Sequence, residues 1–388
     1  MRSRNILALL GVALAVSPLA FAETANVNVY GTLNVSFESV KAVGVTNPVA
    51  KTYVNRFRLA SNSSNIGFKV SEDISEGLKA FLQLESAVNP NSGDGVWNVR
   101  NSGIGLTGNF GTAVIGTWDT PFKLANMFME PFYSTGVGFM ATILDSTAGA
   151  VSSTFYNENP LSFTRRQKQS VQYWSPSVAG FTLKTMYSTN EKRDVDLDNP
   201  DLLGATLAYS EGPVNASFSY EQHDDFAGRS ASALPFGGLT VKNTKDVGLK
   251  AAAGYKLFDS LSLGAAWSNL KYEATSGAGT AEYKKDSFVF TAMQKFDAWT
   301  LRAGWGKAND GTCKNADGSA CTADSKFGAT LLALGASYSM SKRTDVYGVY
   351  SKISNNEHGT YNFAVSKLDT VNAGADPTAV ALGIRHTF

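Results

Sequence analysis

Apolar and polar residues alternate one by one along many short segments of this chain. In Asn26–Phe37 the apolar positions are Val27, Val29, Gly31, Leu33, Val35 and Phe37, with mostly polar residues between them. A period of two residues predicts a β-strand with one apolar and one polar face. The same pattern recurs in Gly180–Ser188, Ser260–Tyr272, Asp286–Met293, Ala298–Ala308 and Asp345–Ile353. Helical periodicity is almost absent, so the sequence predicts an all-β protein.

The connections between these segments alternate in length. Seven tight links fall at Ser71–Gly77, Gly108–Gly111, Ser175–Gly180, Ser210–Pro213, Phe258–Leu261, Phe296–Trp299 and Met340–Asp345. Eight longer polar or Gly-rich segments lie near 39–52, 88–98, 119–163, 190–200, 223–244, 273–284, 309–326 and 354–376. Seven short turns and eight long loops predict sixteen antiparallel strands, with both chain ends on the short-turn side.

An even strand number with turns on one side and loops on the other is typical of a transmembrane antiparallel β-barrel, in which closure leaves no unpaired sheet edge in lipid. A soluble all-β protein is the alternative. The polar faces are rich in Asn, Ser, Thr and Lys, which suits a hydrated lumen. Aromatic residues near the strand ends, typical of interfacial girdles, are Tyr187, Tyr209, Tyr220, Trp267, Trp299, Trp305, Tyr338 and Tyr347. These features favour the barrel, with short periplasmic turns and long extracellular loops.

The first residues of the chain have a different character. Residues 1–22 combine Arg2 and Arg4 with an apolar run and a small-residue end, which predicts a secretory signal peptide before a single barrel domain at residues 23–388. The whole chain carries 34 Lys and Arg, 33 Asp and Glu and a formal charge of +1, and losing those two arginines makes it −1. Bulk charge therefore predicts no nucleic-acid partner. Two cysteines cannot hold so long a chain together.

The connection at 119–163, third among the long loops, exceeds the usual length of a structureless loop. Its Phe, Met, Tyr and small residues suggest that it folds back into the lumen and narrows the channel. An outward surface loop, or two missed strands, is the alternative. In the lumen its carboxylates would oppose basic residues of the wall and set an ion preference. The acids are Glu130, Asp145 and Glu158, and the candidate wall bases are Arg56, Arg58, Arg100, Arg166 and Lys168.

Alternation assigns a side to most of these bases. In Arg165–Tyr173, Val171 and Tyr173 look lipid-facing, which turns Arg166 and Lys168 inward and Arg165 outward. Arg100 shares its parity with Ile104 and Leu106, which should face lipid. An inward Arg100 therefore requires a bulge or a bend in its strand.

Several stretches resemble the general diffusion porins of Gram-negative outer membranes, in the form found in beta-proteobacteria. They are Val27–Gly31, Ile66–Ser86, Gly105–Phe122, Gln169–Phe181 and the terminal Gly383–Phe388. The resemblance implies a sixteen-stranded barrel, a homotrimer of separate pores, and a third loop inside each lumen facing wall arginines. Arg100 and Arg166 stand where family arginines stand. Asn65 occupies a position where the family often has Arg, which argues against strong anion selectivity.

Catalytic and metal-binding patterns are weak. His223, His358 and His386 share no ligand spacing, and His223–Asp225 reads as a solvated loop. No Ser or Asp stands against an oriented His, so we expect neither an enzyme nor a cofactor. Cys313 and Cys321 lie eight positions apart in the seventh long loop. In an oxidising compartment we expect them to form a disulfide, with a free or metal-bound pair as the alternative.

The sequence therefore predicts an outer-membrane channel for passive diffusion of ions and small hydrophilic solutes. The alternative is a substrate-selective channel or a surface binding protein such as an adhesin. Expected partners are two further copies of the chain, outer-membrane lipid and lipopolysaccharide, and the outer-membrane assembly machinery. Phe388 ends an alternating strand, which resembles the signal that this machinery reads.

Overall fold

The computed structural model describes residues 26–46, 53–133, 135–146, 162–189, 200–226, 243–321 and 326–388. The predicted signal peptide lies outside these residues. Within them, strands predominate, and the helices are α1 (Pro121–Leu124), η1 (Met127–Met129) and α2 (Ala141–Leu144). None of the described helices has the length and apolar character needed to cross a membrane.

The strands form one antiparallel sheet. In the first half they are β1 (Asn26–Val43), β2 (Tyr53–Ser61), β3 (Asn65–Ser75), β4 (Leu78–Asn89), β5 (Asp94–Val96), β6 (Ser102–Gly108), β7 (Gly111–Asp119), β8 (Arg166–Trp174) and β9 (Phe181–Thr189). In the second half they are β10 (Asp201–Glu211), β11 (Val214–Asp224), β12 (Thr244–Leu257), β13 (Leu261–Ser276), β14 (Gly279–Phe296), β15 (Trp299–Ala308), β16 (Thr312–Lys314), β17 (Ala329–Ser339), β18 (Thr344–Asn355) and β19 (Asp376–Thr387).

Three of the barrel strands are interrupted once. β2 and β3 both pair with β1, β5 and β6 both pair with β4, and β15 and β16 both pair with β14. When each pair is taken as one interrupted strand, the described residues form sixteen barrel strands, as the sequence predicted.

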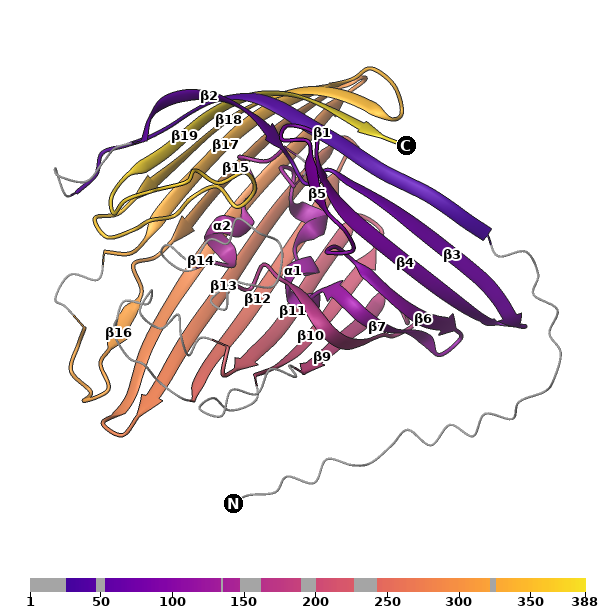
Figure 1. Cartoon of the computed structure of the whole chain (residues 1–388), viewed down its shortest axis with the longest axis horizontal. Helices are drawn as coiled ribbons and strands as arrows, with labels where there is room; N and C mark the ends of the chain where they lie inside the picture. The colour runs from indigo at the N-terminus through magenta and orange to yellow at the C-terminus, as the bar shows by residue number, and fades with distance from the viewer. Residues whose placement is uncertain are drawn as a thin grey trace.

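The first and last strands close the barrel. β1 pairs along one edge with β19, from Thr32 opposite Thr387 to Val43 opposite Asp376. Its other edge pairs with β2 and β3, so the ring is continuous (Figure 1). Because closure pairs the backbone groups of the terminal strands, neither edge stays open to lipid.

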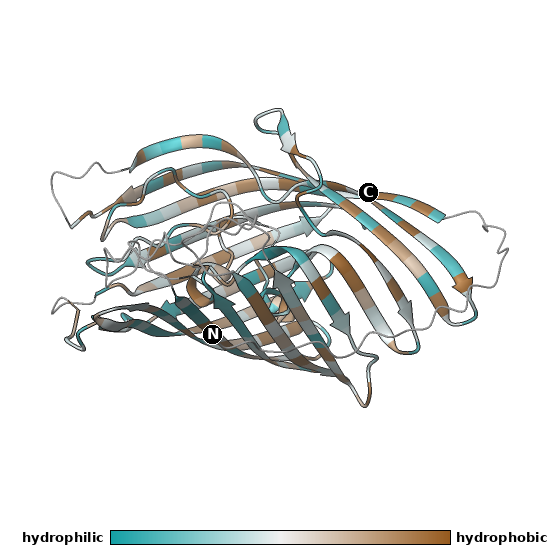
Figure 2. Ribbon diagram, turned by 60° about the horizontal axis from the view of Figure 1, so that its bottom comes forward, coloured by the Kyte–Doolittle hydropathy of each residue, from teal (hydrophilic) through white to brown (hydrophobic). Residues whose placement is uncertain are grey.

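Side chains alternate between the two faces of the wall. On β1, Leu33 and Phe37 are 41% and 52% exposed, whereas Asn34, Ser36 and Glu38 are buried toward the interior. Figure 2 shows the same alternation as brown and teal bands along the strands. The apolar outer face suits lipid, and the polar inner face suits a water-filled lumen.

The seven predicted short turns are present, but two predicted loops are shorter than expected. β13 and β14 continue to Ser276 and Gly279, so the 273–284 segment is a hairpin with a two-residue turn. Within it Thr275 and Thr280 share a 3.0 Å hydroxyl hydrogen bond. In the 88–98 segment, β5 pairs with the end of β4. In this extension of β13 and β14 the apolar residues lie on the inner face, where Tyr272, Ala274, Ala281 and Tyr283 are buried, and polar residues lie outside. The lipid-facing apolar pattern that marked the other strands is therefore absent there.

Segments of two connections pack inside the ring of strands, where α1 and α2 lie in Figure 1. Residues of the third connection and residues 356–375 join wall residues in one apolar cluster that includes Phe132, Met140, Tyr361 and Phe363. Tyr347, expected in an aromatic girdle, instead points inward, is 6% exposed and donates a 2.7 Å hydrogen bond to Asn34 Oδ1. Tyr347 points inward because alternate residues of β18, including Val349, face the lumen.

Candidate functional site in the barrel lumen

The described part of the third connection starts with a capped helical turn. Thr120 Oγ1 accepts a hydrogen bond from Lys123 N at 3.2 Å, and Pro121 occupies the first helical position, where a missing N–H costs nothing. The capped turn directs the chain from β7 along the inner wall.

Hydroxyl groups of the wall then hold the connection through its backbone. Ser217 on β11, Thr291 on β14 and Ser268 on β13 donate to the carbonyls of Ala125, Met129 and Leu144, at 2.6, 2.7 and 2.6 Å. These hydrogen bonds satisfy carbonyls that no helix or strand pairs. Small hydroxyl residues on the inner face therefore position the connection, a role that the sequence analysis did not assign to them.

Lys250 on β12 makes a direct charge contact with the third connection. Its Nζ lies 2.7 Å from Asp145 Oδ1 and donates to Phe122 O at 2.9 Å and Asn126 Oδ1 at 3.0 Å. Thr164 Oγ1 donates to the other Asp145 oxygen at 2.8 Å. Both charged side chains are fully buried. Asp145, a predicted constriction residue, therefore pairs with a wall base, but with one that the sequence analysis did not name.

Lys285 on β14 is a second buried base of the inner wall. Its Nζ donates to Ile143 O at 3.1 Å, to Ser287 Oγ at 3.1 Å and to Tyr361 OH at 3.0 Å. It thus contacts both connections that enter the lumen. Alternation along its strand could have placed it inward, but no sequence signal names its partners.

Arg166 belongs to a compact polar group at the start of the connection. One of its nitrogens lies 3.1 Å from Asp119 Oδ1, and its Nε donates to Asn101 Oδ1 at 2.7 Å. Lys123 Nζ lies 2.6 Å from the same Asp119 oxygen. Burial lowers the pKa of Lys123 to about 8, although Asp119 acts in the opposite direction. Arg166 thus faces an acid of the wall and not a carboxylate of the loop.

Arg100 points inward because its strand is interrupted. It lies between β5 and β6, so the alternation that would have turned it toward lipid does not apply. Its guanidinium forms an ion pair with Glu85 on β4, whose other oxygen accepts from Tyr30 OH at 2.9 Å. Burial raises the pKa of Tyr133 on the third connection, and the positive charge of Arg100 acts in the opposite direction.

The predicted inward orientation of Lys168 is wrong. Between Gly116 and Trp118 the pairing of β7 with β8 shifts, so that Lys168 and Gln169 together oppose Thr117. Gln169 has a φ of 51°. This β-bulge breaks the alternation, and Lys168 is exposed on the face shared with Ile115 and Val171, not on the inner face.

The carboxyl group of Glu130 contacts the backbone of its own connection and not the wall bases that were predicted to face it. Its two carboxylate oxygens accept from Phe132 N and Met140 N, each at 3.0 Å, and thereby close the connection on itself. Burial raises the pKa of Glu130 to about 8, against the opposing effect of these N–H groups. The carboxyl faces its own segment and not a wall base. Glu158, the third predicted acid, lies outside the described residues.

Arg165 and His223 were both misplaced by the sequence analysis. Arg165 precedes β8, where alternation does not yet apply, and its guanidinium is buried 4.6 Å above the Phe226 ring. His223, expected in a solvated loop, is fully buried on β11, stacked on Phe163 at 4.5 Å and 2.9 Å from Glu221 Oε1. In the described part of the chain no group of three or more His, Cys, Asp or Glu side chains is arranged to hold a metal ion.

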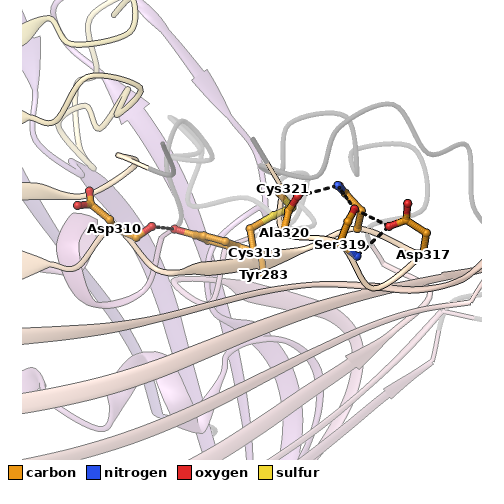
Figure 3. The surroundings of a disulfide bond; sticks show 8 residues. Tyr283, Asp310, Cys313, Asp317, Ser319, Ala320 and Cys321 are labelled. Atoms are coloured by element: carbon orange, nitrogen blue, oxygen red, sulfur yellow. Dashed lines mark hydrogen bonds between the residues drawn. A yellow bond between two sulfur atoms is a disulfide. The ribbon is translucent and has the colours of Figure 1, made fainter. Parts of the chain in front are cut away.

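Cys313 and Cys321 form a disulfide that closes the small hairpin at β16 (Figure 3). Cys321 N donates to Cys313 O at 3.3 Å, and Tyr283 OH on β14 donates to Asp310 O at 3.1 Å. Cys321 is buried beside a group of aromatic side chains that includes Tyr283. The disulfide therefore closes the hairpin on itself, and the pairing of β16 with Glu282–Lys284 holds the hairpin on the extended end of β14.

Phe388 completes the seam between the first and last strands. Its N donates to Gly31 O at 3.1 Å, and Gly31 N donates to Phe388 O at 3.2 Å. Its ring, 41% exposed, lies over Gly31, where an added Cβ would come within 2.5 Å of it. Glycine at this position therefore leaves room for the terminal aromatic ring.

A closed barrel with an apolar outside and a lumen crossed by its own connections is the architecture of a channel-forming outer-membrane protein. A family model described as Gram-negative porin matches residues 8–358. The chain belongs to the Gram-negative porin family, as its sequence motifs indicated. Members of this family are channels and not enzymes.

Individual relatives agree with this assignment. The major outer membrane protein P.IB of Neisseria lactamica is 26% identical over 336 residues, covering 86% of this chain and 89% of the relative. Outer membrane porin protein 32 of Delftia acidovorans is 25% identical over 334 residues, covering 84% and 85%. The protein is therefore an integral outer-membrane porin of a Gram-negative bacterium and a channel for passive diffusion.

Solved structures share the fold. The anion-selective porin from Comamonas acidovorans superposes with a TM-score of 0.74 at 22% identity, covering 94% of this chain and all of that one. OmpT of Vibrio cholerae, in a structure described as a trimer form, gives 0.64 at 16% identity, covering 94% and 100%. At these identities the likeness concerns the barrel architecture alone.

Proposed function

We propose that the third connection forms the constriction of this porin and that ion pairs around it set its ion preference. The observation that carries this proposal is the pair between Asp145 on the connection and Lys250 on the wall, 2.7 Å apart. A charged contact that joins a lumenal segment to the barrel fixes both the width and the field of the passage beside it. Arg100 and Arg166 belong to the same region through Tyr133 and Asp119.

Glu130 and Lys168 have other roles in this proposal. Glu130 shapes the connection through its backbone hydrogen bonds, and Lys168 lies outside the lumen. Glu158 stays a predicted member of the constriction. Because Arg100, Arg166 and Lys250 each have an acidic partner, we infer only a weak preference for either ion sign.

Recording from purified protein in planar lipid bilayers tests the proposal. Replacing residues 124–144 by a short Gly-Ser linker should raise the single-channel conductance, because the segment would no longer occupy the lumen. An unchanged conductance in correctly folded protein would show that the connection does not restrict flow. Ohmic current that scales with salt supports unselective diffusion, whereas saturation and block by a solute would favour a substrate-selective channel.

We also propose that the protein assembles as a homotrimer of separate pores. The family resemblance and the trimer form of the Vibrio cholerae neighbour support this. Trimers predict three equal conductance steps per insertion event and a chemically cross-linked species of three chains. Single steps together with a monomeric cross-linking pattern would contradict the assembly while leaving the channel function intact.

A further inference from the structure

Residues 356–375, the connection between β18 and β19, lie in the lumen together with the third connection. Tyr361, Phe363 and Leu368 are at most 1% exposed, although they belong to a loop. We call this segment the eighth connection. A loop that only covered the barrel mouth would not need to bury side chains of this size.

The eighth connection has a defined internal shape. Asn362 Oδ1 accepts from Phe363 N at 2.8 Å and Leu368 N at 3.0 Å, while its Nδ2 donates to Leu368 O at 2.7 Å. At its base Gly374 N donates to Gly359 O at 2.9 Å. One buried amide therefore braces the turn, and the two ends of the segment lie side by side.

The eighth connection contacts the third connection directly. Thr142 Oγ1 on α2 donates to Asn362 O at 2.7 Å. Phe139 and Ala141 of the third connection cluster with Ala364 and Val365. Lys285 of the wall donates to a carbonyl of one connection and the Tyr361 hydroxyl of the other. The two segments are thus packed as one body inside the ring of strands.

Arg58 fastens the other side of this body to the wall. Its side chain forms a 2.8 Å ion pair with Glu38 on β1 and donates to Lys367 O at 2.9 Å and to Ser366 O. Ser366 Oγ adds a 3.1 Å hydrogen bond to Ser61 O. The buried Glu38 carboxylate thus holds the guanidinium in position. The remaining N–H groups of Arg58 donate to backbone carbonyls of the eighth connection.

We propose that the eighth connection is a second constriction element of the channel, and that Arg58 is the residue that anchors it to the barrel wall. Its side chains occupy lumen volume that would otherwise conduct, and its contacts restrain the third connection from the opposite side. The inference requires only that the barrel conducts, and does not depend on which segment makes the narrowest point.

Removing the segment is the direct test. Residues 360–373 are replaced by an Asn-Gly turn between Gly359 and Gly374, whose backbones are already hydrogen-bonded. Single-channel conductance should rise on the order of 1.5-fold, because a restriction in series with the pore is lost. Folding is checked by the mobility of unheated protein in SDS gels. An unchanged conductance in folded protein would overturn the proposal.

Arg58→Met with the matched control Arg56→Met tests the anchor without a deletion. Arg56 lies on the same strand, two residues away, and is exposed, with its guanidinium 5.5 Å from the Tyr53 ring centroid. Both changes remove one positive charge from the same face. Arg58→Met should add current noise and brief states of higher conductance, because the connection loses its anchor, whereas Arg56→Met should not. Identical current traces from the two variants would show that Arg58 contributes only its positive charge to the lumen and does not anchor the eighth connection.

A third measurement places the segment in the conducting path. Lys367 is exposed, and Lys367→Cys introduces a thiol into a chain whose two cysteines are bonded to each other. Labelling with a bulky anionic methanethiosulfonate should reduce the open-channel current of this variant and leave the parent protein unaffected. Complete labelling with no change in current would exclude the segment from the pathway. If replacing residues 124–144 raises the conductance while all three tests here fail, only the second constriction is refuted.

Discussion

Lys250 Nζ lies 2.7 Å from Asp145 Oδ1, and this contact ties the end of the third connection to strand β12. Neither side chain is exposed, so removing one partner leaves a buried charge without its counterion. Such a loss costs about 3 to 5 kcal/mol. We expect Lys250→Met to lower the thermal stability of the folded protein, measured by gel mobility after heating, and to increase open-channel noise in bilayers.

Asp145→Asn provides the other half of a double-mutant cycle, because the amide oxygen can still accept from Thr164. The combined variant leaves no unpaired charge, so it should be more stable than either single variant. A combined loss equal to the sum of the two single losses would show that the residues do not act as a pair.

Arg166 and Lys168 make a matched comparison on one strand. Arg166→Gln should shift the reversal potential in a salt gradient toward cation preference, because Asp119 then loses Arg166, one of the two bases that lie within ion-pair distance of its Oδ1 atom. The shift should be larger at 0.1 M than at 1 M salt, since screening lengths fall from about 10 Å to about 3 Å. Lys168→Gln should leave the reversal potential unchanged, because the bulge turns this side chain outward. Equal shifts in the two variants would be incompatible with the bulge.

Glu130 predicts a pH dependence of stability. Its pKa is about 8 in the folded protein, raised by burial from the ordinary 4.5. Between these values the folded carboxyl keeps a proton that the unfolded one has lost. Stability therefore falls as pH rises from about 4.5 to about 8 and levels off above, by up to roughly 1.4 kcal/mol per pH unit.

Glu130→Gln should flatten this profile, because an amide has no proton to lose. The measurement is the temperature of the mobility transition at pH 5, 7 and 9. Glu357→Gln is the control, since the Lys326 ammonium 2.8 Å away lowers the pKa of that exposed carboxyl, whose contribution is constant across this range. A parent protein equally stable at pH 5 and pH 9 would contradict the buried, protonated state.

The disulfide predicts a local effect. Closing a loop between residues eight positions apart lowers the entropy of the unfolded chain, which stabilises the folded state by about 2.5 kcal/mol in the chain-entropy model. Cys313→Ser combined with Cys321→Ser should expose the β16 hairpin to added protease, detected by mass spectrometry of the fragments. Conductance should stay the same, because the hairpin keeps its backbone pairing with Glu282–Lys284 of β14 without the disulfide, and Lys250 keeps its contacts with Asp145 and Phe122 O. A changed conductance in a double variant whose hairpin still resists protease would contradict a purely local role of the disulfide.

The barrel could be predicted because each wall strand repeats one local rule. In β1, lipid outside and polar surroundings inside require alternation, and a signal of period two is visible without knowledge of any partner strand. The same rule failed at Lys168, where one extra residue in β8 shifts the register. It also failed at Arg100 and Arg165, which lie beside strands and not in them.

The contacts inside the lumen could not be read from alternation. Period two turns Lys250 inward but does not indicate which acid it meets, because the path of the third connection depends on packing. The eighth connection was predicted only as a long loop, although Phe363 and Leu368 are buried. A loop has no periodicity, and its burial depends on contacts with segments that are distant in the sequence.

Phe388 predicts an effect on assembly that is separate from conduction. Its backbone pairs with Gly31 through two hydrogen bonds, so it is the last residue of the seam that closes the barrel. If the terminal aromatic is also what the assembly machinery reads, deleting Phe388 should reduce the amount of folded protein in the outer membrane. Molecules that do fold should conduct normally, because Phe388 lies at the strand end and outside the lumenal contacts. Phe388→Tyr keeps an aromatic end and should insert at nearly the parent level, whereas equal loss in both variants would indicate a requirement for this one side chain. The measurement is folded protein per cell by unheated gel, with single-channel recordings of the recovered fraction.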